Sequence, residues 1–351
     1  MDAEPAAGPR AAGPPAARAT LSDVAALAGV TPGTASRALN GRGQLRPETR
    51  RRVLAAAERL EFHPNVLAQS LLSGRSRTVG LITTDSIGRF SIPVMLGAED
   101  ALGAGQISVL LCDTRGDAIR ERHYLRTLSA RGVDGIIVAG RRVDPRPPLP
   151  GTAGIPAVYA LGPSTDPDDA SVISDDEHGV RLAVQHLLAS GRTRIAHVTG
   201  PEHHAAATLR AAYTRAALAE HDLEFATGRP HHGEWSEAWG RAAAGTVLRT
   251  DPRCDAFFCG NDQIARGVAD ALRESSRRVP GDIAVVGYDN WDVMALSSRP
   301  PLTTVDTNLL EVGRTAALHL MDAIDGQPHH GVQTVPCHLV VRESSGPPGG
   351  H

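Results

Sequence analysis

The sequence predicts a small helical N-terminal domain followed by a larger α/β domain built on doubly wound parallel sheets. Within residues 19–63, short helical segments are separated by Gly and Pro breaks. From Arg77 onward, apolar strands alternate with helices, which is typical of parallel sheets covered by helices. At 351 residues the chain is long enough for two or three domains. We expect a disordered tail at 1–18, a headpiece at 19–63, a hinge helix and linker at 64–78, a two-lobed domain at 79–345 and a tail at 346–351.

Composition limits the compartment and the chemistry. The first 18 residues are rich in Ala, Pro and Gly and lack the apolar segment of a signal peptide. No apolar stretch approaches the ~20 residues that a membrane span needs. The four cysteines are scattered, which suits reduced thiols, and the adjacent His pairs lack the partners of a metal site. We expect a cytoplasmic, nucleoid-associated protein with no membrane segment, no metal and no cofactor.

Charge is distributed unevenly along the chain. Residues 1–78 contain 11 Arg and 6 acidic residues, a net charge of +5. The rest therefore holds 36 − 11 = 25 basic and 39 − 6 = 33 acidic residues, a net charge of −8. A basic end on an acidic body indicates that only the end meets a polyanion, although a solvated charged surface would give the same count.

The segment from Thr20 to Leu39 predicts two short helices joined by a tight turn. Apolar residues recur at helical spacing after Thr20 or Ser22, either of which can cap the first helix. Gly29 suits the left-handed C-cap, and Thr31 with Pro32 suits the start of the second helix. Such a pair is a helix-turn-helix, whose second helix enters the major groove of DNA.

A third helix is expected from Pro47 to about Leu60, with Val53, Leu54, Ala57 and Leu60 on its apolar face. Its arginines at 50–52 either contact phosphates or form a solvated face. After the break at Pro64, a helix of about two turns is expected. Because so short a helix is marginal in water, it needs a partner in order to form.

At these residues the chain resembles the lactose repressor/galactose repressor (LacI/GalR) family. The resemblance rests on residues 19–30, 34–40, 49–53 and 64–71, and it extends over about 19–345. It implies that two headpieces bind a near-palindromic operator and that paired hinge helices enter the minor groove. Leu71 would then wedge into a central base step, as apolar side chains of minor-groove binders do.

The same resemblance implies a set of DNA-binding residues. They are Thr20, Thr31, Pro32, Gly33, Thr34, Ser36, Arg37, Asn40, Arg51, Asn65, Ala68, Gln69 and Leu71. Pro32 and Gly33 replace base-reading side chains common in the family, so readout should rest on Thr31, Thr34 and above all Arg37. The Arg37 guanidinium fits O6 and N7 of guanine. Ala35 replaces the usual valine, which predicts slightly looser headpiece packing.

The second domain alternates strands and helices. Strands are expected at 79–84, 107–112, 135–139, 157–161, 194–199, 256–259 and 283–288. Helices are expected at 93–103, 119–130, 177–190, 205–220, 237–249 and 262–275. This spacing suggests two similar lobes, which resemble the periplasmic-binding-protein-like core of the family. By that resemblance the chain crosses between lobes near 173–174, 302–304 and 326–334.

Polar motifs follow several of these strands, and ligands of such sheets bind outside the carboxyl ends of the strands. The resemblance assigns Arg210, Asn261 and Asp289 to the effector, with Trp235 stacking on it. Phe90 and Asp175, which also follow strands, are further candidates. Asp289 could instead be a turn residue, Trp235 a core residue and Asp262 a helix cap. Arg210 is followed by Ala211 to Tyr213, where the family usually has a glycine, so the effector is hard to name.

These features predict a homodimeric transcriptional repressor controlled by a small effector between the lobes, with a sugar as the first expectation. An activator of the same family, or a sensor of a nucleoside or another metabolite, remains open. We expect no enzyme, because the sequence contains no phosphate-binding loop, nucleophile elbow or metal-ligand cluster. We also expect no exported binding protein, because a headpiece is present and an export signal is not. A two-fold dimer matches a palindromic site.

Overall fold

The computed structural model describes residues 19–39, 44–62, 74–103, 107–152 and 154–346. The chain divides into two compact units, Met1–Gly74 and Arg75–His351. The predicted hinge contacts Asn65, Ala68, Gln69 and Leu71 lie outside the described residues, as does Asn40. They remain predictions.

The described part of the smaller unit contains three helices, α1 (Leu21–Ala28), α2 (Pro32–Leu39) and α3 (Pro47–Arg59). Thr20 caps α1: its hydroxyl accepts a hydrogen bond from the amide of Asp23, whose carboxylate accepts one from the amide of Thr20. Gly29 ends α1 at φ 63°, the left-handed conformation that favours glycine. Thr31 then accepts from the amide of Thr34 at 3.2 Å and starts α2. The helix-turn-helix is therefore present.

Small side chains fill the interior of this unit. Its buried residues are Val24, Ala25, Ala28, Ala35, Ala38, Val53, Ala56 and Ala57. The prediction that Leu54 belongs to the apolar face of α3 is wrong, because this side chain is 47% exposed. Ala56 takes its place: positions 53, 56 and 57 share one helical face, and residue 54 is turned away by one step.

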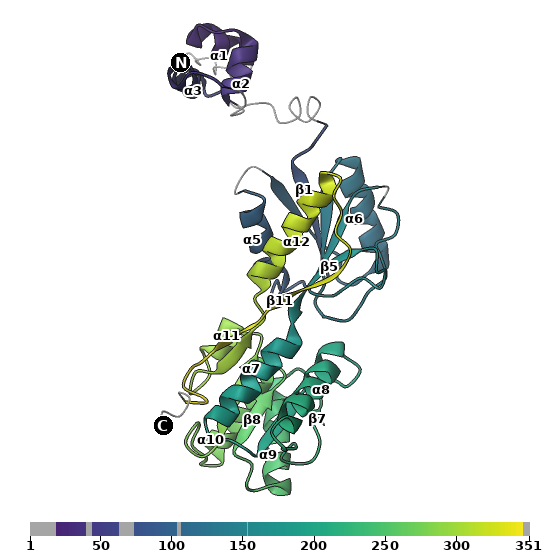
Figure 1. Cartoon of the computed structure of the whole chain (residues 1–351), viewed down its shortest axis with the longest axis vertical. Helices are drawn as coiled ribbons and strands as arrows, with labels where there is room; N and C mark the ends of the chain where they lie inside the picture. The colour runs from purple at the N-terminus through teal and green to yellow at the C-terminus, as the bar shows by residue number, and fades with distance from the viewer. Residues whose placement is uncertain (1–18, 40–43, 63–73, 104–106, 153, 347–351) are drawn as a thin grey trace, which may run out of the picture. The chain divides into compact units, whose positions relative to one another are not determined.

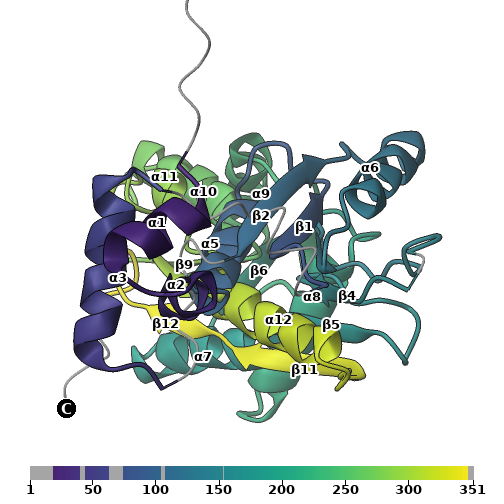
Figure 2. The same ribbon diagram turned by 90° about the horizontal axis from the view of Figure 1, so that it is seen from above.

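The first lobe, here the N-lobe, has a six-stranded parallel sheet in the order β11-β5-β4-β3-β1-β2. Its strands are β1 (Thr78–Thr83), β2 (Ser108–Asp113), β3 (Gly135–Ala139), β4 (Ala157–Ala160), β5 (Ala170–Asp175) and β11 (Gly331–Pro336). Helices α5 (Ser91–Ala101) and α12 (Leu309–Ile324) lie side by side on one face, as Figure 1 and Figure 2 show. Helix α6 (Ala118–Ala130) covers the other face.

The second lobe, here the C-lobe, has a sheet in the order β12-β10-β9-β8-β6-β7. Its strands are β6 (Ile195–Thr199), β7 (His231–His232), β8 (Ala256–Cys259), β9 (Ala284–Tyr288), β10 (Thr303–Asp306) and the antiparallel edge strand β12 (His338–Val340). Helices α9 (Glu237–Thr250) and α10 (Asp262–Glu274) pack on one face, and α7 (Asp176–Ala189) and α8 (Ala205–Ala219) on the other. A one-turn helix, α11 (Asp292–Ala295), follows β9.

The chain crosses between the lobes at three places, each a few residues after the expected position. The crossings lie between β5 and α7, between β10 and α12, and between β11 and β12. They are hydrogen-bonded to one another: the Ser174 hydroxyl donates to the Thr307 carbonyl at 2.6 Å, and the Cys337 thiol donates to the Asp175 carbonyl at 3.2 Å. The three segments therefore form one joint.

Each strand expected between 79 and 288 is found within one residue of its predicted ends. Helix α12 is missing from the predicted elements, because it lies between two crossings, where the strand-helix alternation breaks down. The edge strand β11 is missed for another reason: most of its residues are exposed, so it shows no buried apolar run. In the part of the chain that the structure describes, no helix is long and apolar enough to cross a membrane.

Glycines allow helices to pack closely in the C-lobe. A Cβ atom at Gly240 of α9 would lie 2.2 Å from the carbonyl oxygen of Ile264 in α10. At Gly245 of the same helix, the nearest group is the mobile end of Arg249, at 3.3 Å. Gly240 is therefore required by packing, and Gly245 is not.

We expect Gly240→Ala to lower the free energy of unfolding by about 1–3 kcal/mol, because backbone must move to admit the methyl group. Gly245→Ala should be neutral or stabilise by up to about 1 kcal/mol, the helix-propensity difference. Chemical denaturation followed by tryptophan fluorescence measures both. Equal stabilities for the two variants would contradict the assigned α9–α10 contact.

Candidate functional site

Helix α2 presents a short polar surface and one arginine. Thr31, Pro32, Gly33 and Arg37 are exposed, whereas Ala35 is fully buried. The Arg37 guanidinium lies along its own helix, with Nε donating to the Gly33 carbonyl at 3.3 Å. Its outer nitrogens are therefore held near the exposed face. Contacts of Thr20, Thr34, Ser36 and these residues with DNA remain predictions.

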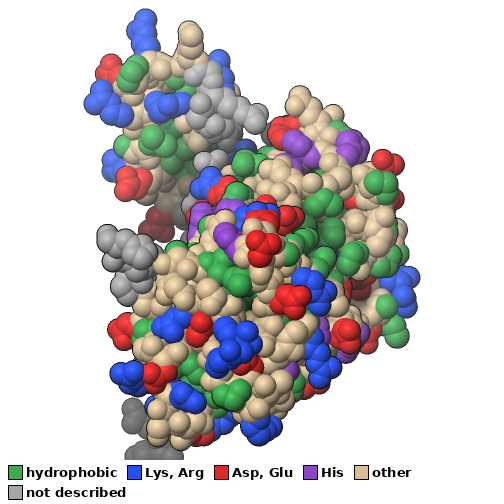
Figure 3. Space-filling model, turned by 60° about the horizontal axis from the view of Figure 1, so that its bottom comes forward, with side chains coloured by type: hydrophobic (Ala, Val, Ile, Leu, Met, Phe, Trp, Pro, Cys, Tyr) green, Lys and Arg blue, Asp and Glu red, His purple; other side chains and the backbone are tan. Residues whose placement is uncertain are grey.

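Basic residues are exposed on α3 as well. Arg50, Arg51 and Arg52 all lie on its surface near the start of the helix. Elsewhere charges of both signs are mixed: the face seen in Figure 3 shows Arg side chains interspersed with Asp and Glu. The exposed arginines of α3 and Arg37 of α2 are therefore the basic groups that the smaller unit offers to a polyanion.

A cavity of about 350 Å³ lies where the carboxyl ends of strands from both lobes meet. Its N-lobe wall includes Asp85, Arg89, Phe90, Arg141, Arg142 and Asp144. Its C-lobe wall includes His204, Arg210, Trp235, Asn261, Gln263, Asp289 and Trp291. This is the size and composition of a small-molecule site: apolar and aromatic walls with a few convergent polar groups.

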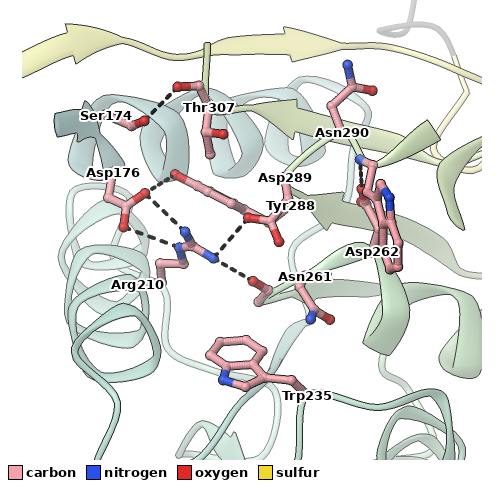
Figure 4. Close-up of polar contacts among 12 residues, drawn as sticks. Ser174, Asp176, Arg210, Trp235, Asn261, Asp262, Tyr288, Asp289, Asn290 and Thr307 are labelled. Carbon is pink, nitrogen blue, oxygen red and sulfur yellow. Dashed lines mark hydrogen bonds and ion pairs between the residues drawn. The ribbon is translucent and has the colours of Figure 1, made fainter. Parts of the chain in front are cut away.

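Arg210 is the central polar group of the cavity (Figure 4). It is 5% exposed, and it donates to the Gly260 carbonyl at 2.8 Å and to both oxygens of Asp176 at 3.3 Å. Its guanidinium carbon lies 3.7 Å from the ring centroid of Tyr288. A buried guanidinium requires such compensation, because removing a charge from water is costly.

Burial by itself would lower the pKa of Arg210, but Asp176, Tyr288 and Asp289 outweigh it and the pKa is raised. Burial, followed by the charge of Asp176, raises the pKa of Tyr288 well above its ordinary value. The Tyr288 hydroxyl donates to Asp176 at 2.7 Å. Over the whole physiological pH range, Arg210 therefore stays positively charged and the Tyr288 phenol stays neutral and hydrogen-bonded.

Asp289 joins this cluster to the other lobe. Its Oδ1 lies 3.6 Å from Arg210, and its Oδ2 is hydrogen-bonded to Arg89 of the N-lobe. The guanidinium carbon of Arg89 lies 4.9 Å from the centroid of the Phe90 ring and 4.4 Å from that of Trp291. Asp289 has φ 93°, an unusual conformation for a residue with a side chain, so it is indeed a turn residue and also lines the cavity.

Asn261 performs two tasks. Its Oδ1 caps α10 by accepting from the amide of Ile264 at 2.8 Å, and its side chain also lines the cavity. The helix cap expected at Asp262 is therefore Asn261. Asp262 is fully buried beside it and accepts from the Thr304 hydroxyl and the Trp291 amide, both at 2.6 Å.

Trp235 forms part of the cavity wall and packs on the C-lobe core. Its ring lies against Gly200, where a Cβ atom would approach it to 2.1 Å. Its Nε1 donates to Nδ1 of His204 at 2.8 Å. The indole is therefore held in a fixed orientation and presents one face toward the cavity.

Of the two remaining candidates for effector binding, Phe90 and Asp175, one lines the cavity and the other does not. Phe90 lines the cavity. Asp175 does not, because its side chain turns to cap α7 by accepting from the amide of His178 at 2.9 Å. Its neighbours Ser174 and Asp176 line the cavity instead.

Several cavity residues were not anticipated. They are Asp85, Arg89, Arg141, Arg142, Asp144, Asp176, His204, Gln263 and Trp291. Most of them stand within a few residues of a strand end, which is the signal that could have identified them. Among the residues that the structure describes, no cluster of His, Cys, Asp and Glu could hold a metal ion.

Comparisons with known proteins agree with this geometry. Residues 20–65 match the family described as bacterial regulatory proteins, lacI family, and residues 184–345 match the periplasmic binding protein-like domain. The chain is 35% identical over 336 residues to the HTH-type transcriptional regulator CelR of Thermobifida fusca, covering 93% of this chain and 98% of CelR. It is 32% identical to the HTH-type transcriptional repressor PurR of Aliivibrio fischeri strain MJ11, over 89% of this chain and 93% of PurR.

Solved structures show the same fold. A complex of CelR with cellobiose has a TM-score of 0.65 at 33% identity, over 93% of this chain and 100% of that one. The Lac repressor dimer bound to operator and the anti-inducer ONPF has a TM-score of 0.71 at 29% identity, over 94% of this chain and 99% of that one.

Asp262 generates a pH prediction. Burial raises its pKa from 3.8 to about 7, and Thr304 only partly opposes this. The folded protein therefore binds a proton that the unfolded chain has lost, so this group destabilises the fold as pH rises from about 4 to about 7. Asp262→Asn should remove that slope, which is at most about 1.4 kcal/mol per pH unit. Denaturation of both proteins at pH 4.5, 6 and 8 is the measurement, and parallel stability profiles would contradict the assignment.

Proposed function

The chain belongs to the lacI family of bacterial regulatory proteins, and from this premise we propose that it is a homodimeric transcriptional repressor. Its helix-turn-helix reads a near-palindromic operator, and a small polyhydroxylated effector, a sugar, binds between the two lobes. Effector binding changes the affinity for the operator. The observation that carries the proposal is the interlobe cavity, in which Asp289 is held by an arginine from each lobe.

The lining supports a sugar as the effector class. Carboxylate, amide and guanidinium groups offer acceptors and donors to the alternating hydroxyls of such a ligand. Trp235, Phe90 and Trp291 supply flat apolar surfaces beside these groups. A related protein, CelR, has been solved with cellobiose. A sugar fits both the polar and the aromatic parts of the wall.

Control of DNA binding follows from the position of the cavity. Groups from both lobes line it, so a ligand that contacts both walls stabilises one lobe arrangement over another. A ligand shifts such an equilibrium only by its differential affinity for the two arrangements. The segment 64–74 joins the lobes to the headpiece, and we propose that the hinge contacts at Asn65, Ala68, Gln69 and Leu71 transmit the shift. The same scheme applies to a repressor that the effector releases from the operator and to one that binds the operator only with its effector.

The proposed boundaries are 19–63 for the DNA-binding headpiece, 64–78 for the hinge and linker, and 79–345 for effector binding and dimerisation. Dimerisation follows from the two-fold symmetry of a palindromic site. A related structure is a Lac repressor dimer on its operator.

Asp289→Asn tests the effector site. The amide keeps the shape of the side chain but loses the charge between Arg89 and Arg210. We expect operator binding to persist, whereas the effector concentration that changes it should rise tenfold or more, because bonds to charged groups contribute about 1.5–3 kcal/mol each. The measurement is fluorescence anisotropy of labelled operator, with effectors found by thermal-shift screening of sugars and nucleosides.

Asp292→Asn is the matched control, because Asp292 is the exposed first residue of α11, three positions away, and does not line the cavity. It should respond like the wild type. An unchanged effector response in Asp289→Asn would place the effector elsewhere, and loss of operator binding without effector would make Asp289 a structural residue.

Arg37→Ala tests readout by α2. We expect a loss of about 1–3 kcal/mol per half-site on the operator and little change on random DNA, because a guanine contact carries specificity. Arg51→Ala should instead weaken both DNAs and reduce the salt slope by about one, as a phosphate contact does. Equal losses on operator and random DNA in Arg37→Ala would show that Arg37 contacts phosphate.

A further inference from the structure

The N-lobe wall of the cavity has more hydrogen-bond donors than partners for them. Arg141 is an exposed residue at the cavity wall, and its side chain makes no hydrogen bond or ion pair with any described residue. Nε of Arg89 is buried and also lacks an acceptor within the described chain. A buried donor without a partner is costly, so an acceptor is expected to reach it.

Arg142 contacts the ring of His204, which a second donor, Trp235, also contacts. Its Nη1 lies 3.0 Å from Nε2 of His204. The other ring nitrogen, Nδ1, already accepts from the Trp235 indole, which can only donate. A neutral imidazole has one acceptor nitrogen, so His204 can accept from the Trp235 indole or from Arg142 but not from both. Burial, with Arg142 and other nearby charges, lowers the pKa of His204, which keeps the ring neutral.

Most carboxylates of the cavity are already used. Asp85 accepts from the amides of Phe90 at 2.6 Å and Ser91 at 3.0 Å. Asp176 and Asp289 each bind an arginine. Asp144 is the exception: Oδ1 accepts from the Ala205 amide at 3.0 Å, but Oδ2 is buried without a described partner. The wall thus offers a place for one hydroxyl beside a surplus of guanidinium donors.

Arg141 and Arg142 line both this cavity and a second one, and so stand at the junction of the two. This second cavity, of about 440 Å³, shares Arg141, Arg142 and Asp144 with the first and continues along the strand ends of the N-lobe. Its other arginines are engaged: Arg146 is bidentate with Glu121 at 3.0 and 3.1 Å, and Arg115 lies 3.8 Å from Asp113. Arg141 and Arg142, which have no carboxylate partner among the described residues, therefore lie together at the junction.

We propose that Arg141 and Arg142 form an anion subsite, and that the effector is a sugar bearing a phosphate or carboxylate group. This rests on the proposed function and refines it. The sugar ring occupies the space between Trp235 and Asp289, and its anionic group points to the junction of the two cavities. Guanidinium groups bind phosphate and carboxylate oxygens through charge-assisted hydrogen bonds, which are about twice as strong as neutral ones.

The test uses the full chain and simple anions as probes. Sodium phosphate, sodium acetate and sodium chloride are titrated at matched ionic strength, and tryptophan fluorescence is recorded. All three tryptophans, Trp235, Trp239 and Trp291, lie in the C-lobe, and two line the cavity, so anions bound to the headpiece contribute little signal. The proteins are the wild type, the double variant Arg141→Gln/Arg142→Gln and the control Arg277→Gln, which is exposed far along the chain after α10.

Phosphate or acetate should change the fluorescence of the wild type and the control beyond the effect of chloride. The double variant should bind that anion about tenfold more weakly or worse, the loss expected for a charge-assisted hydrogen bond. A response to phosphate alone assigns the group as phosphate, and a response to acetate alone assigns it as carboxylate. The inference is overturned if neither anion exceeds chloride, or if the double variant responds like the wild type. A neutral sugar that still changes operator affinity would then leave the proposed function standing.

Discussion

The buried guanidinium of Arg210 is the constraint on which the rest of the site depends. It lies almost without solvent contact, so Asp176, Gly260 and Tyr288 must be arranged around it. Asp176 is the first residue of α7, directly after the first crossing between the lobes. Arg210 therefore fixes the joint of the two lobes to the strand ends of the C-lobe, and Asp289 extends the same network to Arg89 of the N-lobe.

This arrangement explains how one cavity can serve both binding and control. The three crossings are hydrogen-bonded together at Ser174–Thr307 and Asp175–Cys337, so the lobes are connected through one narrow joint. The contacts that span the cavity, such as Arg89–Asp289, are polar, and a ligand that offers polar groups of its own can replace them. Replacing them changes the relative energy of lobe arrangements, which is the physical requirement for coupling.

The helix-turn-helix and seven of the strands could be predicted from the sequence, because periodicity, caps and breaks are local signals. The other strands are short or lie at sheet edges or next to the crossings, and most residues of the cavity wall were missed with them. Arg210, Trp235, Asn261 and Asp289 came from a family resemblance and do line the cavity, but their role toward an effector remains a prediction. The prediction that Asp175 lines the cavity was wrong by one position: neighbouring residues on a strand point to opposite sides, and Ser174 is the one that faces the cavity. Arg89 and Arg142 were not predictable, since their partners across the cavity are 200 and 62 residues away along the chain.

The central claim is that effector and operator bind to one coupled equilibrium, and reciprocity tests it most directly. Effector affinity is measured by calorimetry with and without saturating operator, and operator affinity with and without saturating effector. The account predicts that the two ratios are equal and differ from one, because coupling free energy is the same in both directions. An effector affinity that operator DNA leaves unchanged, for a ligand bound in the cavity, would contradict it.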